Sequence, residues 1–207
     1  MITCPRGGTL LGDEMKTRLI IAATAALMTA CGGSTTHETG GDASAATINA
    51  NAAVAASLPL ADQQDFEDAR RGFIGVDDPA VFAGPGGKPA WDLSAYAFVQ
   101  GDAPPTVNPS LWRQAKLNGI AGLFEVVPGI HQVRGYDISN MTLIDGKNGW
   151  IVVDPLTSRE TAAAALALAR RHLGDKPVTA IIYTHSHVDH FGGVAGVLPT
   201  LVLPPSP

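Results

Sequence analysis

The chain has few cysteines, few aromatic residues and little charge for its length. Of 207 residues only two are Cys, 6% are aromatic and 16% are charged. Cys4 and Cys31 lie outside the segments that look folded, which excludes a disulfide framework and a thiolate zinc site. Lys and Arg total 14 against 19 Asp and Glu, and no run concentrates the cations, so we expect no nucleic-acid partner. The 45% of hydrophobic residues is enough for one ordinary domain with a tail.

Residues 1–31 have the pattern of an export signal. Lys16 and Arg18 form a basic start, and the apolar stretch 19–30 is too short to span a bilayer. The ending Leu-Met-Thr-Ala-Cys resembles a bacterial lipobox with Cys31 as the lipidated residue, and Met15 is then the expected initiator. The alternative is an ordinary signal peptide with a free Cys nearby. We therefore expect an exported, periplasmic protein that touches the membrane only through a lipid anchor.

Composition divides the rest of the chain into four parts. Residues 32–57 are rich in Gly, Ala, Ser, Thr and Asn and are expected to be a flexible tether. Residues 58–119 alternate charged segments with Gly and Pro, which indicates an irregular amino-terminal arm containing one helix, capped by Asn108 and stopped by a left-handed Gly119. Residues 120–197 are the folded part, and 198–207 form a proline-rich tail.

Within 120–197, short apolar runs separated by turn residues predict an antiparallel meander with strands at 124–127, 130–133, 141–144 and 150–153. A capping box at Thr157 and Glu160 then opens a helix that ends at Gly174. The continuous apolar run 178–183 is typical of an interior strand covered on both faces. The expected order is strands, helix, strand and then a histidine-rich loop.

That loop concentrates possible metal ligands. Alternate residues of an extended segment project to the same side, so His185 and His187 can face one cation. Asp189 and His190 follow after a bend and could serve a second cation. Imidazole and carboxylate suit zinc, iron or manganese, and the lack of Cys favours an open, hydrolytic site over a structural one. The alternative is a loop whose histidines only cap and hydrogen-bond, as we expect of the remaining histidines, which are structural or solvated: His37, His131 and His172.

The segment Thr184–Gly193, THSHVDHFGG, resembles the metal motif of the metallo-β-lactamase superfamily. The resemblance implies an α/β fold, here the amino-terminal and incomplete part of an αββα sandwich. It also implies two zinc ions in the complete enzyme, one held by His185 and His187 and the other by Asp189 and His190. Asp154 matches an earlier Asp of the superfamily that supports the metal loop without binding metal.

Longer stretches resemble the alkyl sulfatases within that superfamily. They are 108–113 (NPSLWR), 122–126 (GLFEV) and 133–142 (VRGYDISNMT), continuing through the helix to Gly193. The resemblance implies a small amphiphilic sulfate ester, such as dodecyl sulfate, as substrate, and a homodimer for the complete enzyme but not for this fragment. The alternatives are a lactonase, thioesterase or β-lactamase of the same fold, and a non-enzymatic lipoprotein remnant.

The chain departs from the family after Val197. Complete members continue with further Glu and His ligands, sulfate-binding Arg and Asn residues, a dimerisation domain and a sterol-carrier-like domain, and the segment 198–207 lacks that texture. A frameshift or premature stop is the expected origin. We therefore expect a truncated, inactive and poorly soluble fragment with exposed apolar strands.

Overall fold

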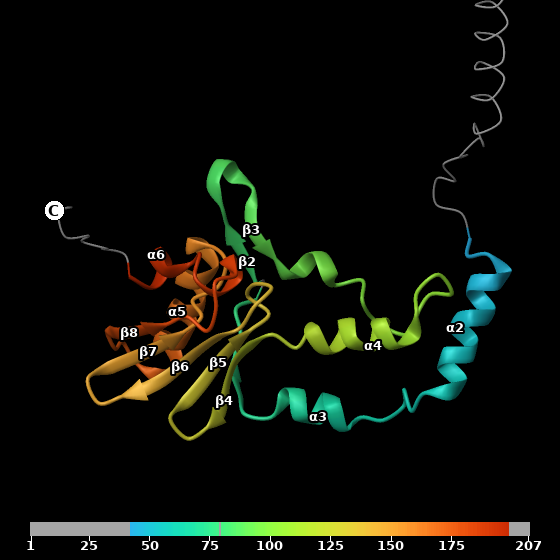
Figure 1. Ribbon diagram of the computed structural model, residues 1–207, viewed down its shortest axis with the longest axis horizontal. Helices are drawn as coiled ribbons and strands as arrows, with labels where there is room; N and C mark the ends of the chain where they lie inside the picture. The colour runs from blue at the N-terminus through green and yellow to red at the C-terminus, as the bar shows by residue number, and fades with distance from the viewer. Residues whose placement is uncertain (1–41, 79, 199–207) are drawn as a thin grey trace, which may run out of the picture. The chain divides into compact units, whose positions relative to one another are not determined.

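The computed structural model describes residues 42–78 and 80–198 (Figure 1). Almost all of them belong to one compact unit that begins at Ala43. The expected export signal, Cys31, His37 and most of the proline-rich tail lie outside the described residues. No helix within the two described ranges has the length and apolar character needed to cross a membrane.

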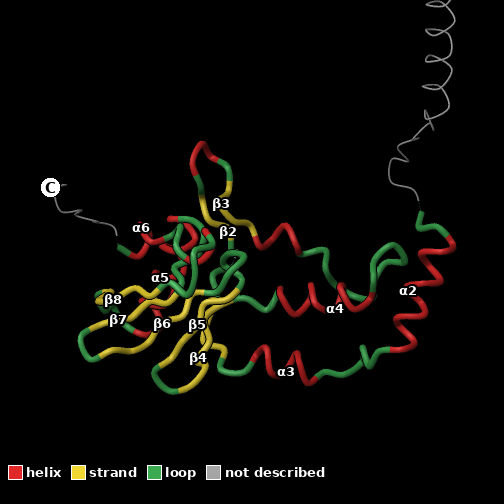
Figure 2. Tube along the Cα trace, in the orientation of Figure 1, coloured by secondary structure: helices red, strands yellow, loops and turns green. Residues whose placement is uncertain are grey.

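A six-stranded sheet forms the centre of this unit, and Figure 2 shows its strands in yellow. In spatial order the strands are β1 (Phe73–Gly75), β4 (Gly122–Val127), β5 (Ile130–Arg134), β6 (Met141–Gly146), β7 (Gly149–Val153) and β8 (Val178–Ile182). Neighbours from β1 to β7 are antiparallel, which confirms the predicted meander. β8 pairs in parallel with β7, so the chain must cross over between them, and the connection is a helix.

That helix, α5 (Arg159–Leu173), covers one face of the sheet. Its buried side chains recur at helical spacing and share one core cluster with alternate strand residues, including Leu143 and Val152. Residues that point to the opposite face, such as Ile144 and Ile151, are only partly buried. Within the described residues this is a helix layer on a sheet layer, the partial α/β sandwich that the sequence predicts.

The arm, 58–119, is more integrated than the sequence suggested. Its elements besides β1 are α3 (Gln64–Arg70), β2 (Val81–Ala83), η1 (Pro85–Gly87), β3 (Pro89–Asp92), η2 (Leu93–Tyr96) and α4 (Pro109–Asn118). β1 joins the main sheet beside β4, and Ala80 and Phe82 belong to the core. The arm thus contains more regular structure than the one helix expected, because its short strands pair and bury apolar residues against the domain.

The helix α2 (Ala45–Ser57) stands where a flexible tether was expected for 32–57. Alanine has the highest intrinsic helix propensity, and the Ser44 side chain caps the helix by accepting a hydrogen bond from the Thr47 amide. Asn51 also donates to the Pro105 carbonyl (2.7 Å) ahead of α4. Because the segment lacks large apolar side chains, no residue of α2 is buried.

Two details of the helix ends differ from the prediction. α4 begins at the predicted Asn108 cap and ends before Gly119, but Gly119 has φ −72° and is not left-handed. α5 is capped by Ser158 rather than Thr157, and its reciprocal partner is Thr161 rather than Glu160. Thr157 lies one residue before this cap, and its hydroxyl donates to Asp137 (2.7 Å).

β8 is an edge strand within the described residues, although its continuous apolar sequence predicted an interior position. Thr179, Ala180 and Ile182 are exposed. Only Val178 and Ile181 pack against the core. The described residues therefore leave part of the apolar surface of β8 uncovered.

Candidate metal centre

The predicted metal loop, 184–193, leaves the end of β8 beside the end of β7. Because these two strands are parallel, their carboxyl ends meet at the same edge of the sheet. Asp154 follows β7 directly, and Thr184 lies two residues beyond β8. The topology therefore brings together a carboxylate and a loop that are 30 residues apart in the chain.

Asp154 connects the two strand ends through three hydrogen bonds. Its carboxylate accepts from the Thr184 amide (2.8 Å), the Thr184 hydroxyl (2.7 Å) and His190 Nδ1 (2.8 Å). The residue is only 7% exposed. These contacts tie Thr184 and His190, the first and the last polar residues of the loop, to one carboxylate.

The charge state of Asp154 follows from this environment. Burial alone would raise its pKa, but the hydrogen bonds from the Thr184 side chain and amide and from His190 hold the pKa below its ordinary value. Asp154 is thus an ionised acceptor near neutral pH. A carboxylate that accepts at Nδ1 orients the His190 ring and leaves Nε2 on the side away from Asp154.

The backbone after β7 is strained where it meets the loop. Asp154 and Leu156 both have positive φ, 54° and 64°, although neither is glycine. The Leu156 carbonyl accepts from the Gly193 amide (2.9 Å). A Cβ on Gly193 would lie 2.1 Å from the Pro155 carbonyl oxygen, so only glycine permits this approach. Gly193 also directly precedes α6 (Val194–Val197).

All four predicted ligands lie in one cluster. The ring centroids of His185 and His190 are 4.0 Å apart, those of His185 and His187 are 4.7 Å apart, and His190 Nε2 lies 3.2 Å from Asp189 Oδ2. Two donor atoms bound to one tetrahedral zinc at about 2.1 Å lie roughly 3.4 Å from each other. The pair Asp189 and His190 therefore fits a shared cation, in donor chemistry and in spacing.

A complete metal site is not assembled in 42–78 and 80–198. No group of three or more His, Cys, Asp or Glu side chains in these ranges is arranged to hold one ion. The structure brings the predicted ligands together, and their assignment as ligands stays a prediction.

Two buried polar residues beside the loop were missed from the sequence. Asp137 accepts from the Thr157 hydroxyl and amide and from the Thr161 hydroxyl. Ser139 donates its hydroxyl to the Asp189 carbonyl. Both belong to a polar turn between β5 and β6, where Asp and Ser are common for local reasons, so the sequence carries no signal of these long-range contacts.

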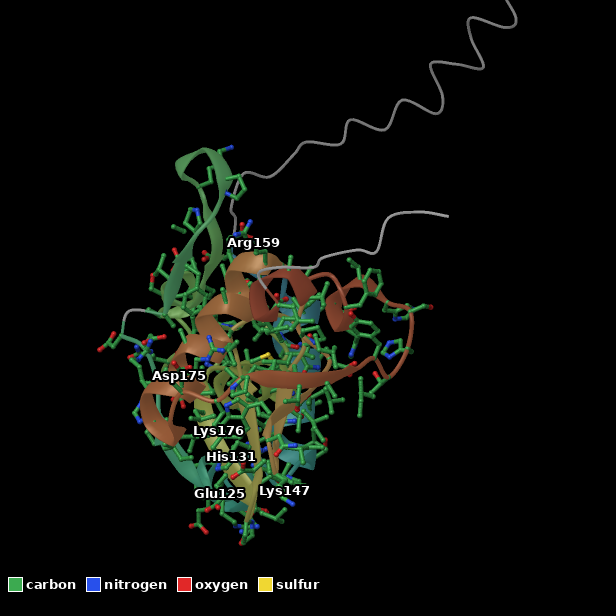
Figure 3. All side chains as sticks on the ribbon, turned by 90° about the vertical axis from the view of Figure 1, so that its left-hand side faces the viewer. Glu125, His131, Lys147, Arg159, Asp175 and Lys176 are labelled. Atoms are coloured by element: carbon green, nitrogen blue, oxygen red, sulfur yellow. The ribbon has the colours of Figure 1, made fainter. Side chains whose placement is uncertain are left out.

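The other described histidines play no part in the cluster. His131 is buried at the far end of the sheet, where Figure 3 shows it with Glu125, Lys147 and Lys176. The His172 ring lies against Gly75 of β1, close enough that a Cβ there would lie 2.5 Å from it. A structural role fits both residues, and His131 is not solvated.

Comparison with known proteins agrees with this geometry. The sequence profile of the Metallo-beta-lactamase superfamily matches residues 134–205. A linear primary-alkylsulfatase of Pseudomonas sp. is 51% identical over 176 residues, which cover 84% of this chain and 26% of the relative. An (R)-specific secondary-alkylsulfatase of Pseudomonas sp. is 51% identical over 161 residues (75% and 24%), and an alkyl/aryl-sulfatase of Saccharomyces cerevisiae is 50% identical over 153 (73% and 24%).

A solved structure gives the same result. The stereoselective inverting sec-alkylsulfatase of Pseudomonas sp. superimposes with a TM-score of 0.72 at 51% identity, covering 76% of this chain and 25% of that one. The fold and the histidine-rich loop thus define part of a metallo-β-lactamase domain. Over about three quarters of its length the chain is homologous to the alkylsulfatases of that superfamily. It spans about a quarter of the length of these relatives.

Proposed function

We propose that this chain supplies the first part of the metal centre of a sulfate-ester hydrolase that acts on amphiphilic alkyl sulfates. The observation that carries the proposal is the 50–51% identity to three proteins named as alkylsulfatases. Identity at this level over 153–176 residues is far more specific than the histidine motif alone.

In this proposal His185 and His187 hold one zinc ion, and Asp189 and His190 hold a second. Two such cations would activate a water molecule near neutral pH and neutralise charge on the sulfate group. Asp154 retains the proton on His190 Nδ1 and so directs Nε2 to the second cation. Val188 in this loop and Ile138 next to Ser139 are 56% and 72% exposed, and they offer apolar surface suited to an alkyl chain.

The competing function is hydrolysis of another ester by the same fold, as in a lactonase, thioesterase or β-lactamase. A chimera distinguishes them: residues 43–197 replace the matching segment of the Pseudomonas (R)-specific secondary-alkylsulfatase, which is 51% identical. We expect the chimera to release sulfate from alkyl sulfates and its His187→Ala variant to be inactive. A folded chimera that holds zinc but cleaves only lactone, thioester or β-lactam substrates would contradict the proposal.

The 207-residue chain itself is expected to bind metal weakly and to lack sulfatase activity. The cluster offers two donors that fit one cation, and no group of three is arranged around one ion in the described residues. Calorimetric titration with Zn²⁺ should detect weak binding that the double variant Asp189→Ala/His190→Ala reduces. Hydrolysis of dodecyl sulfate by the purified chain with stoichiometric metal would overturn the expectation of inactivity.

The surroundings of the protein are also proposed from sequence. Residues 1–31 direct export, and Cys31 carries a lipid that holds the protein at the periplasmic side of a membrane. Metabolic labelling with a radioactive fatty acid tests this, because Cys31→Ser should abolish the label. The complete enzyme is proposed to be a homodimer.

A further inference from the structure

The turn between β5 and β6, residues 135–140, reaches three separate parts of the molecule. Three of its residues are buried, since Tyr136, Asp137 and Ser139 are 0%, 7% and 8% exposed, whereas Ile138 is 72% exposed. Each buried side chain makes its polar contacts with a different segment. Such contacts give a short polar turn a fixed position.

Two of these contacts hold the turn itself. The Tyr136 hydroxyl donates to the Asp77 carboxylate (3.0 Å) and accepts from the Asp77 amide (2.9 Å), which fastens the turn to the arm. Asp137 accepts from the Thr157 amide (3.0 Å) and hydroxyl (2.7 Å) and from the Thr161 hydroxyl (2.6 Å), which fastens it to the start of α5. A buried carboxylate with this many donors is a strong and specific anchor.

The third contact reaches the metal loop. The Ser139 hydroxyl donates to the Asp189 carbonyl, and both residues are at least partly buried. Asp189 lies in the single turn η3 (Val188–His190), whose backbone bonds use the carbonyls of His187 and Val188. In the described residues the Asp189 carbonyl has Ser139 as its hydrogen-bond donor, so this hydroxyl fixes the backbone between the side chains of Asp189 and His190.

We propose that Ser139 is a positioning residue that holds Asp189 and His190 in register for a shared cation. This inference rests on the proposed function, in which those two side chains bind metal. Loss of a hydrogen bond just outside a ligand set typically lowers metal affinity by about 10-fold to 100-fold. Ser139→Ala removes the donor, and Ser139→Thr keeps it.

The test uses the full chain and two measurements. In the metal-free chain, hydrogen exchange at the amides of His190, Phe191 and Gly192 should accelerate about 10-fold in Ser139→Ala, because one net hydrogen bond stabilises the loop by that order. Ser139→Thr should restore slow exchange. The matched control is Ser57→Ala, which also removes a hydroxyl that donates to a backbone carbonyl, that of Val54 (3.1 Å), but in α2.

The second measurement is Co²⁺ titration followed by visible absorption. Ser139→Ala should weaken Co²⁺ binding about 10-fold and alter the spectrum, and Ser139→Thr and Ser57→Ala should match the parent chain. Unchanged loop exchange in Ser139→Ala, or acceleration spread equally over α5, would overturn the proposal. A parent chain that binds no Co²⁺ would contradict the proposed ligands instead, and the exchange data alone would then decide whether Ser139 fixes the loop.

Discussion

At the scale of single residues, two buried carboxylates hold together segments that are distant in the sequence. Asp154 holds Thr184 and His190, and Asp137 holds Thr157 and Thr161. Both carboxylates sit at the edge of the sheet where β5 and β7 end, since these strands run in the same direction. Carboxylates that accept from several donors set the geometry of this edge.

The buried Tyr136 hydroxyl should make the free energy of unfolding depend on pH. Burial raises the pKa of its hydroxyl well above the ordinary value, and the adjacent Asp77 charge raises it further against an opposing effect of the Asp77 amide. The unfolded chain loses the phenol proton near pH 10, before the folded chain does, so the contribution of Tyr136 to stability is present below about pH 10 and is lost above it. Tyr136→Phe should therefore cost about 1 kcal/mol at pH 7 and reduce the loss of stability between pH 9 and 11.

Urea denaturation at pH 7, 9 and 11 measures both effects. Tyr96→Phe is the matched control, because it removes a hydroxyl from a tyrosine that is 54% exposed. An identical pH profile for the parent chain and Tyr136→Phe would contradict the assignment.

The sequence predicted that the four polar loop residues lie together, but it did not predict the residues that hold the loop in place. The spacing of His185, His187, Asp189 and His190 placed them together because an extended segment and a bend fix local directions. Asp137 and Ser139 were missed since their partners are 20 to 50 residues away, and no local pattern encodes such distances.

At the scale of elements, the start of α5 shows how a tertiary contact moves a local signal by one residue. The sequence predicted Thr157 as the cap, and the structure has the next residue, Ser158, which is equally competent chemically. Asp137 binds the Thr157 hydroxyl, which leaves Ser158 to accept from the Thr161 amide (3.1 Å). The capping box is real, but its register depends on a residue in another turn.

This assignment predicts different effects of two substitutions. Ser158→Ala should lower the free energy of unfolding by about 1 kcal/mol, because it removes the acceptor at the helix start. Glu160→Ala should change it by only a few tenths of a kcal/mol, since Glu160 has no capping role. Thermal unfolding by circular dichroism separates the two, and a larger effect of Glu160→Ala would favour the register first predicted from the sequence.

The segment 45–57 illustrates a second limit of sequence patterns. Low apolar content led to the prediction of a flexible tether, which is wrong for residues 45–57 because they form α2. Alanine favours helix without any burial, and no residue of α2 is buried. Burial and helicity are separate properties, so a composition that cannot support burial does not exclude a helix.

At the scale of the whole molecule, the meander from β4 to β7 was readable because apolar runs and turns are local, whereas the pairing of β1 with β4 was not predicted. The interior position predicted for β8 was not found: Ala180 and Ile182 are exposed in the part of the chain that the structure describes. An exposed apolar edge strand offers unpaired backbone groups to another chain.

We therefore expect the 207-residue chain to self-associate through β8. Ala180→Lys should shift the equilibrium toward the monomer by about 10-fold, or about 1.4 kcal/mol, because a charged edge disfavours pairing. Ala167→Lys adds the same charge at an exposed position of α5 and should leave association unchanged. Sedimentation velocity measures this, and equal effects of both variants would show that net charge alone is responsible.

The two edges of the sheet are unequal, and this limits how far such association can proceed. β1 is only three residues long and its register with β4 is shifted, which makes that side a poor template. A molecule with a single exposed strand edge can pair with only one other molecule through that edge. Growth into fibres requires two such edges, so association through β8 should stop at two chains and form no filaments.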